Sequence, residues 1–184
     1  MKPPQGEVLL FLDVDGVLNN TSDPTVSRQA LDEGALWQLK ALLEAVPDAK
    51  IILSSAWRLV AKMTRLLSQQ LESFGIPSPV GATSVVGSSR VRLGETANLD
   101  KQIRMLAEQR ANEIFLAVKE RRPRAWCAVD DLDLSPFIKD ATFVRTDEKV
   151  GLDEAGRRAV VANFHEQLKR NDAAQAAEDG PWKV

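Results

Sequence analysis

The amino-acid sequence predicts a three-layer α/β fold in which helices cover both faces of a central parallel sheet. Short, continuous apolar runs alternate with longer stretches of helical period, the pattern of strands that are buried on both faces. Strands and helices that alternate in this way form parallel strands joined by crossover helices. The chain has 184 residues, 44% hydrophobic and 27% charged, as in an ordinary globular domain. We therefore expect a single domain over residues 1–170 and a flexible tail over residues 171–184.

Four apolar runs are the predicted strands. The first, Val8 to Leu12, is continuous and stops at a polar turn, as a buried parallel strand does. The others cover residues 51–53, 125–129 and 141–144. One further short strand, over residues 82–86, is expected within a segment rich in Gly, Ser and Pro.

Helices are predicted where apolar side chains recur at spacings of three and four. These stretches cover residues 35–46, 58–74, 97–120 and 153–168, and we expect the third to be broken near Arg110. Gly75, followed by Pro77, is typical of the C-terminal end of a helix and closes the second stretch.

Composition excludes several classes of protein. One cysteine, Cys127, allows no disulfide within the chain, and with the single histidine, His165, it cannot supply a zinc site of four Cys and His ligands. The net charge of −2 argues against holding nucleic acid by bulk electrostatics, although a local basic patch stays open. No apolar run has the length of a signal peptide or a membrane span, so we expect a cytoplasmic protein.

Carboxylates follow the first and third apolar runs. Asp13 and Asp15 come directly after the first run and stand beside Gly16, and Asp130 and Asp131 end the third. In parallel α/β folds the ligand site lies beyond the carboxyl ends of the strands, so these groups are expected to meet there. Clustered carboxylates attract a divalent cation, and one carboxylate can attack phosphorus while another handles a proton. Two solvated acidic turns are the alternative.

Hydroxyl groups follow the second apolar run. Ser54 and Ser55 stand just before a predicted helix, where a hydroxyl and helix N-terminal amides make a cradle for phosphoryl oxygens. A simple helix N-cap explains the serines equally well. Trp57 either packs under this turn or stacks on a substrate, and Arg58 either contacts phosphate or pairs with a nearby acid.

These segments resemble a known family, the haloacid dehalogenase (HAD) superfamily of phosphohydrolases. Residues 13–17 (Asp-Val-Asp-Gly-Val) are similar to its motif I, residues 53–54 to motif II and residues 129–131 to motif IV. More narrowly, the chain resembles the HAD domain of Swiss Army Knife RNA repair proteins, over about residues 8–168. The segments that carry this narrower likeness are residues 12–19, 54–58, 113–114 and 151–152. The resemblance implies a Rossmann-like HAD fold with a minimal cap or none.

The resemblance also implies a mechanism. Asp13 would be the nucleophile that forms an aspartyl-phosphate, and Asp15 would protonate the leaving group and then activate water. Mg²⁺ would be held by the Asp13 carboxylate, the Asp15 backbone carbonyl and a motif IV carboxylate. Asp130 and Asp131 both match motif IV, and the choice between them stays open.

The family further requires a cation, its motif III, to neutralise the phosphoryl group. Arg110 is the first choice, because residues 110–114 resemble the pattern before the motif IV strand, and Lys101 is the second. A solvated charge on a helix is the alternative for either residue. Ser54 would complete the catalytic set as motif II, with Ser55, Arg58 and Lys101 as substrate-binding residues.

Substrate choice in this superfamily is often set by a cap domain. The segments between the motifs are too short for an obvious cap, so the site is expected to be open to bulky phosphorylated substrates, such as a nucleic-acid end or a phosphoprotein, without excluding a nucleotide. A loop over residues 77–95, with Arg90 and Arg92, would act as a small lid. The sequence thus predicts a Mg²⁺-dependent phosphatase. A catalytically idle HAD-like binding or regulatory module is the alternative.

Overall fold

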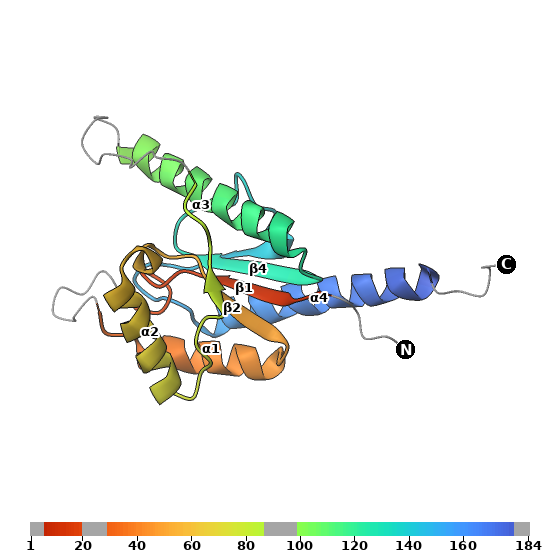
Figure 1. Cartoon of the computed structure of the whole chain (residues 1–184), viewed down its shortest axis with the longest axis horizontal. Helices are drawn as coiled ribbons and strands as arrows, with labels where there is room; N and C mark the ends of the chain where they lie inside the picture. Colours follow the sequence, from red (N-terminus) through yellow and green to blue (C-terminus); the bar gives the residue numbers. More distant parts are fainter. Residues whose placement is uncertain (1–5, 20–28, 87–98, 179–184) are drawn as a thin grey trace.

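The computed structural model describes residues 6–19, 29–86 and 99–178, and it confirms the predicted parallel α/β architecture (Figure 1). Five parallel strands form one sheet in the order β3-β2-β1-β4-β5. The strands are β1 (Val8–Leu12), β2 (Ala49–Leu53), β3 (Gly81–Ala82), β4 (Ala125–Asp130) and β5 (Phe143–Arg145). The helices are α1 (Glu33–Ala45), α2 (Ala61–Ser73), α3 (Leu99–Arg121) and α4 (Glu154–Glu178), with short 3-10 helices η1 (Ala56–Leu59) and η2 (Asp140–Thr142).

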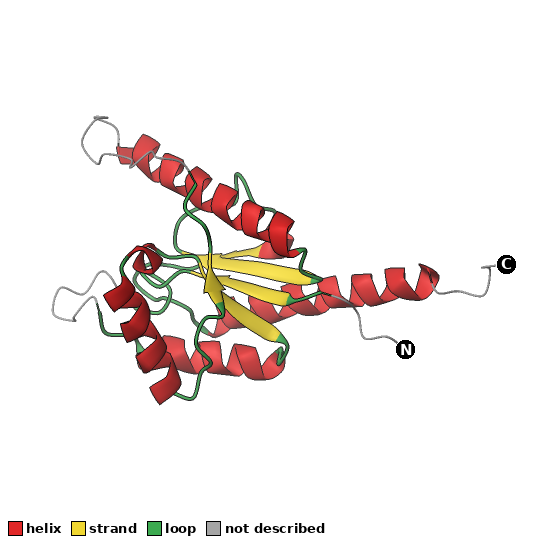
Figure 2. Cartoon of the chain, in the orientation of Figure 1, coloured by secondary structure: helices red, strands yellow, loops and turns green. Residues whose placement is uncertain are grey.

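Helices cover the sheet unequally on its two faces (Figure 2). On one face α1, α2 and α4 pack on alternate strand residues such as Leu10, Leu12 and Cys127. On the other face α3 packs on the intervening residues, such as Phe11 and Ile52. This division follows from the strand geometry, because successive side chains of a strand point to opposite faces.

The direction in which the chain adds strands to the sheet reverses between β1 and β4. From β1 the chain adds β2 and β3 on one side, and it then crosses back to add β4 and β5 on the other. The carboxyl ends of β1 and β4 therefore flank a topological switch point, which is where open α/β sheets form ligand sites. Asp13 and Asp130 lie at these two strand ends.

Several helix and strand boundaries differ from the sequence expectations. Helix α3 is continuous through Arg110, because no Gly or Pro interrupts it and buried Ala107, Ala111 and Ile114 continue at helical spacing. Strand β3 ends at Ala82, and the next carbonyl, that of Thr83, accepts a hydrogen bond from the Arg58 side chain.

The predicted second helix is divided, and the last helix is longer than expected. Residues 56–59 form the 3-10 helix η1, capped by the Ser55 side chain, and α2 begins at Ala61. At its other end Gly75 has φ +75°, as expected for a residue that closes a helix. Helix α4 continues to Glu178, through an alanine-rich stretch of high helix propensity, so the part of the expected tail up to this residue is helical.

In the described residues, the two places where the resemblance would put a cap domain hold only short elements. After β1 the described residues form a tight turn over 13–19, and after β2 they form η1, α2 and β3. The predicted lid residues Arg90 and Arg92 lie outside the described residues. Among the helices that the structure describes, none has both the length and the apolar character needed to cross a membrane.

Candidate active site

A row of four polar side chains crosses the sheet at the carboxyl ends of the strands. In the strand register Leu12 lies beside Val129 and Leu53, and Leu53 lies beside Ala82. The next residue of each chain segment is polar, and from β4 to β3 these residues are Asp130, Asp13, Ser54 and Thr83. Because side chains alternate between faces, the register places all four on the face that α3 covers. All four are buried.

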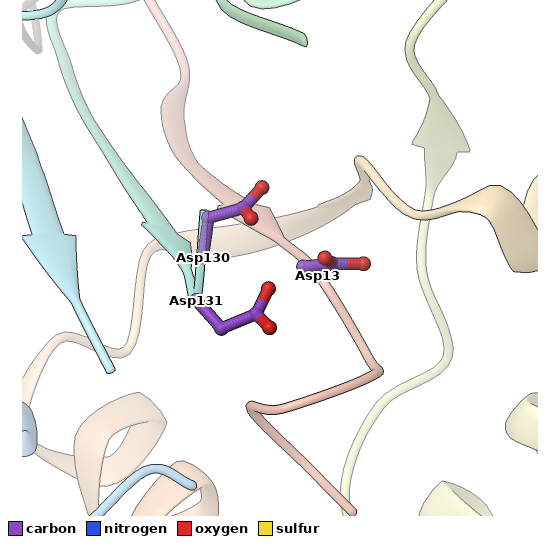
Figure 3. A group of neighbouring side chains, drawn as sticks. All are labelled: Asp13, Asp130 and Asp131. Carbon is purple, nitrogen blue, oxygen red and sulfur yellow. The ribbon is translucent and has the colours of Figure 1, made fainter. Parts of the chain in front are cut away.

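Three carboxylates meet at the switch point. Asp13, Asp130 and Asp131 each offer an oxygen within 4.8 Å of the other two. Figure 3 shows Asp130 and Asp131 at the end of β4, with their carboxylates on the side of the strand that faces Asp13 at the end of β1. Both predicted motif IV acids therefore belong to the group. The Asp15 side chain is not in this group, and its backbone carbonyl as a metal ligand stays a prediction.

Arg110 reaches this acidic group from α3. Its Nη1 lies 2.6 Å from Asp130 Oδ2 and 3.0 Å from Asp13 Oδ2. The other oxygens of these two acids accept backbone hydrogen bonds, Asp13 Oδ1 from Val14 at 2.8 Å and Asp130 Oδ1 from Leu132 at 3.0 Å. One guanidinium thus bridges the two buried carboxylates, which backbone amides hold in place.

The charges of the group are not balanced by Arg110 alone. Burial raises the pKa of Asp130 well above its usual value, with Arg110 opposing this and Asp13 adding to it. Burial and then the charge of Asp13 raise the pKa of Asp131 to about 6. Burial by itself would lower the pKa of Arg110, but Asp13 and Asp130 raise it. Three carboxylates beside one guanidinium leave an excess of negative charge, which a divalent cation would neutralise.

The turn after β1 places Gly16 against the acidic group. Gly16 adopts φ +72°, and a Cβ there would lie 2.6 Å from Asp131 Oδ2, so only glycine fits this close approach. Thr146 Oγ1 donates to the Gly16 carbonyl at 2.8 Å and fixes the turn to the segment after β5. Beside Asp131 this segment lines an open cavity of about 460 Å³ with residues 145–148.

Both oxygens of the Asp15 carboxylate accept hydrogen bonds. Trp57 Nε1 donates to Oδ2 at 3.0 Å, and Asn19 Nδ2 donates to Oδ1 at 2.9 Å. Asn19 Oδ1 in turn accepts from the Gly16 amide at 3.1 Å. These two N–H donors, one on each oxygen, hold the carboxylate in a fixed orientation.

The two predicted serines differ in their contacts. Ser54 Oγ is buried and has no hydrogen-bond partner among the described residues, which leaves it available to a ligand. Ser55 Oγ accepts from the Trp57 amide at 3.3 Å and caps η1. The structure therefore brings Ser54 into the polar row, whereas the Ser55 hydroxyl has the capping contact that the sequence left open.

Arg58 and Lys101 lie apart from the acidic group. Arg58 forms an ion pair with Glu113 of α3 and also donates to the backbone carbonyls of Ser55, at 2.7 Å, and Thr83, at 3.0 Å. Lys101 is exposed nine residues before Arg110, about 13 Å along the axis of α3. Of the two predicted motif III cations, the structure brings Arg110 to Asp13.

Sequence reasoning did not predict the contacts of Trp57 and Glu113 at the site, and it missed Thr83 altogether. The sequence left Trp57 either packed under the turn or stacked on a substrate; the structure buries it and also joins its indole N–H to Asp15. Glu113 stands one helical turn after Arg110, a spacing that could have marked it as a second inward-facing charge. Thr83 is buried in the polar row with an unpartnered hydroxyl, and no local signal marks it because β3 is so short.

Comparison with known protein families agrees with this geometry. The family model of the HAD domain in Swiss Army Knife RNA repair proteins matches residues 9–156, which include the turn after β1, Arg110 and the end of β4. Comparisons with curated proteins and with solved structures give no match. The matched region covers most of the chain and all of its sheet except Val8. The chain therefore belongs to the HAD-domain family of Swiss Army Knife RNA repair proteins.

Proposed function

We propose that this protein is a Mg²⁺-dependent phosphatase that transfers the phosphoryl group of a phosphomonoester to Asp13 and then hydrolyses the aspartyl-phosphate. The observation that carries the proposal is the position of Arg110, whose guanidinium bridges Asp13 and Asp130 beside Asp131. A carboxylate nucleophile, a cation for phosphoryl oxygens and a set of oxygen ligands for a metal thus share one buried site.

The first step is attack by an Asp13 carboxylate oxygen on phosphorus, which forms one P–O bond and breaks the bond to the leaving group. The Val14 amide holds the Asp13 side chain in place for this attack. Arg110 stabilises the negative charge of the phosphoryl oxygens, and the unpartnered Ser54 hydroxyl donates a hydrogen bond to one of them.

The metal that the family implies fits the donor groups present. Asp13, Asp130 and Asp131 offer only oxygens, which is the ligand type that Mg²⁺ prefers, and their excess negative charge favours a divalent cation. When bound there, Mg²⁺ supplies positive charge that offsets the repulsion between the carboxylates and the phosphate.

Asp15 supplies the proton transfers in this proposal. It gives a proton to the leaving-group oxygen in the first step and takes one from water in the second, when water attacks phosphorus and releases Asp13. Asp15 is only partly buried and stands two residues beyond the nucleophile, so its carboxylate lies at the same end of the sheet as Asp13.

We propose a phosphorylated nucleic-acid end as the substrate, with a free nucleotide as the smaller member of the same class. The family to which the chain belongs is described from RNA repair proteins, which supports this choice. The cavity beside Asp131 offers room next to the reacting group. Because the net charge is −2, contact with a nucleic acid would depend on local groups rather than on a basic surface.

Substitution of the nucleophile tests the proposal. Asp13→Asn should lower phosphate release from p-nitrophenyl phosphate with Mg²⁺ by at least about a thousandfold, because the amide is a poor nucleophile. Asp133→Asn is the matched control, since this acid stands three residues after Asp130 but is half exposed and accepts from Ser135. It should keep nearly full activity.

The substrate is tested with a panel of 3′- and 5′-phosphorylated oligonucleotides, nucleotides and sugar phosphates. The proposal predicts the highest kcat/KM for an oligonucleotide end or a nucleotide, and loss of all activity with EDTA. Retained activity in Asp13→Asn would contradict the nucleophile. Absence of both phosphate release and Mg²⁺ binding in the unaltered protein would favour a catalytically idle binding module.

A further inference from the structure

We propose that Trp57 is a positioning residue whose indole N–H holds the Asp15 carboxylate in the orientation needed for proton transfer to the leaving group. The inference rests on the proposed function, in which Asp15 is the general acid and base. It assigns a role in the reaction to the 3-10 helix η1, which carries Trp57 and follows the end of the neighbouring strand β2.

The contact between Trp57 and Asp15 has the geometry of a good hydrogen bond. Nε1 lies 3.0 Å from Asp15 Oδ2, while Asn19 Nδ2 lies 2.9 Å from Oδ1 on the other side. One donor on each oxygen fixes both side-chain torsions of the aspartate. Without the indole N–H, Asn19 would be the one side-chain donor among the described residues that still holds the carboxylate.

These contacts leave Asp15 able to carry a proton. An ionised carboxylate has about four lone-pair positions, of which Trp57 and Asn19 occupy two. With respect to the described residues, each oxygen therefore keeps one position for a proton that is exchanged with a leaving group or with water. The two donors orient the carboxylate without blocking it.

Trp57 is itself held firmly. Its side chain is 5% exposed and belongs to the core between the sheet and the helices α1, α2 and α4. Its backbone amide donates to Ser55 Oγ at 3.3 Å, and its carbonyl accepts from Thr64 Oγ1 at 3.2 Å. A buried indole with a fixed backbone directs its one polar atom to a defined point.

The side chain of the next residue, Arg58, holds the same turn in place through three contacts. Its guanidinium binds the carbonyl of Ser55 in the turn, the carbonyl of Thr83 beyond β3 and the carboxylate of Glu113 in α3. The side chains of Arg58 and Glu113 are 8% and 2% exposed, so the pair is buried. The turn that carries Trp57 is therefore fixed to the sheet and to the helix that carries Arg110.

Leaving-group dependence distinguishes this role from a structural one. A poor leaving group needs a proton from Asp15, whereas nitrophenolate departs without one. We therefore expect Trp57→Phe, which removes the donor, to lower kcat/KM by about tenfold or more for phenyl phosphate and by less than about threefold for p-nitrophenyl phosphate. A structural defect would lower both values by the same factor.

One control and one second replacement of Trp57 accompany this variant. Trp126→Phe changes a second tryptophan, which is partly buried on β4 about 13 Å along the strand from Asp130, and it should leave kcat/KM unchanged for both substrates. Replacement of Trp57 by benzothienylalanine keeps the shape of the indole and puts sulfur in place of the N–H, so it carries the test if the phenylalanine variant does not fold. It should show the same selective loss as Trp57→Phe.

The outcomes separate the inference from the function on which it rests. A selective loss on phenyl phosphate with either replacement of Trp57 supports the positioning role. Equal losses on both substrates, in a protein whose phosphate release still depends on Asp13, would overturn the role of Trp57 alone. Phosphate release that does not depend on Asp13 would overturn the proposed function and this inference together.

Discussion

Asp131 is the carboxylate of the acidic group whose raised pKa is easiest to test by experiment. Burial and the neighbouring Asp13 raise its pKa to about 6, with Arg110 opposing the shift. A carboxylate must lose its proton before it can bind a metal. Protons and Mg²⁺ therefore compete for Asp131 at mildly acidic pH.

Mg²⁺ affinity should consequently depend on pH. As the pH falls through about 6, Asp131 takes up a proton and the apparent affinity for Mg²⁺ should decrease, whereas above this pH it should level off. Titration calorimetry at a series of pH values measures this directly. Asp131→Asn should bind Mg²⁺ more weakly with a flatter pH dependence near 6. An affinity that does not change through this range would contradict the placement of Asp131 among the ligands.

At the scale of elements, α3 contributes two opposite charges to the site from adjacent turns. Arg110 pairs with Asp13 and Asp130 of the strands, and one turn later Glu113 pairs with Arg58 of η1. Gln109 Nε2 also donates to Glu113, at 3.0 Å. Because both ion pairs lie at the carboxyl ends of the strands, they fix the helix in register with the acidic group.

Removal of the Glu113 charge should therefore loosen α3. Glu113→Gln leaves Arg58 buried without its ionic partner, so we expect the free energy of unfolding to fall by about 3 kcal/mol. Because Arg110 is carried by the same helix, kcat/KM should fall as well. Urea denaturation and steady-state kinetics measure the two effects. Glu108→Gln, an exposed position on α3, is the control, and an equal, small effect of both substitutions would contradict the account.

Elements that depend on local pattern were predictable from the sequence, and contacts between distant segments were not. The continuous apolar run before Asp13 predicts β1 and its end, and the same reasoning predicts that Asp130 ends the neighbouring strand β4. The contact from Trp57 to Asp15 joins residues 42 apart in the chain. It depends on how η1 is turned at the end of β2, which no periodicity records.

At the scale of the whole molecule, the strand order decides which side chains can meet. Because β1 lies between β2 and β4, Asp13 has Ser54 on one side and Asp130 on the other. The apolar residues of the strands form the two cores, and the first polar residue after each strand forms the row under α3. The fold thus brings the proposed nucleophile, a hydroxyl and the proposed metal ligands together at the carboxyl ends of its strands.

The most direct measurement is the detection of the phosphoryl group on Asp13. In Asp15→Asn the first step still proceeds with p-nitrophenyl phosphate, which needs no proton, but water is not activated, so the aspartyl-phosphate should accumulate. Borohydride reduction after denaturation should convert Asp13 to homoserine, seen by mass spectrometry as a loss of mass in its peptide, together with one equivalent of nitrophenol. Release of nitrophenol with Asp13 unmodified would contradict the account.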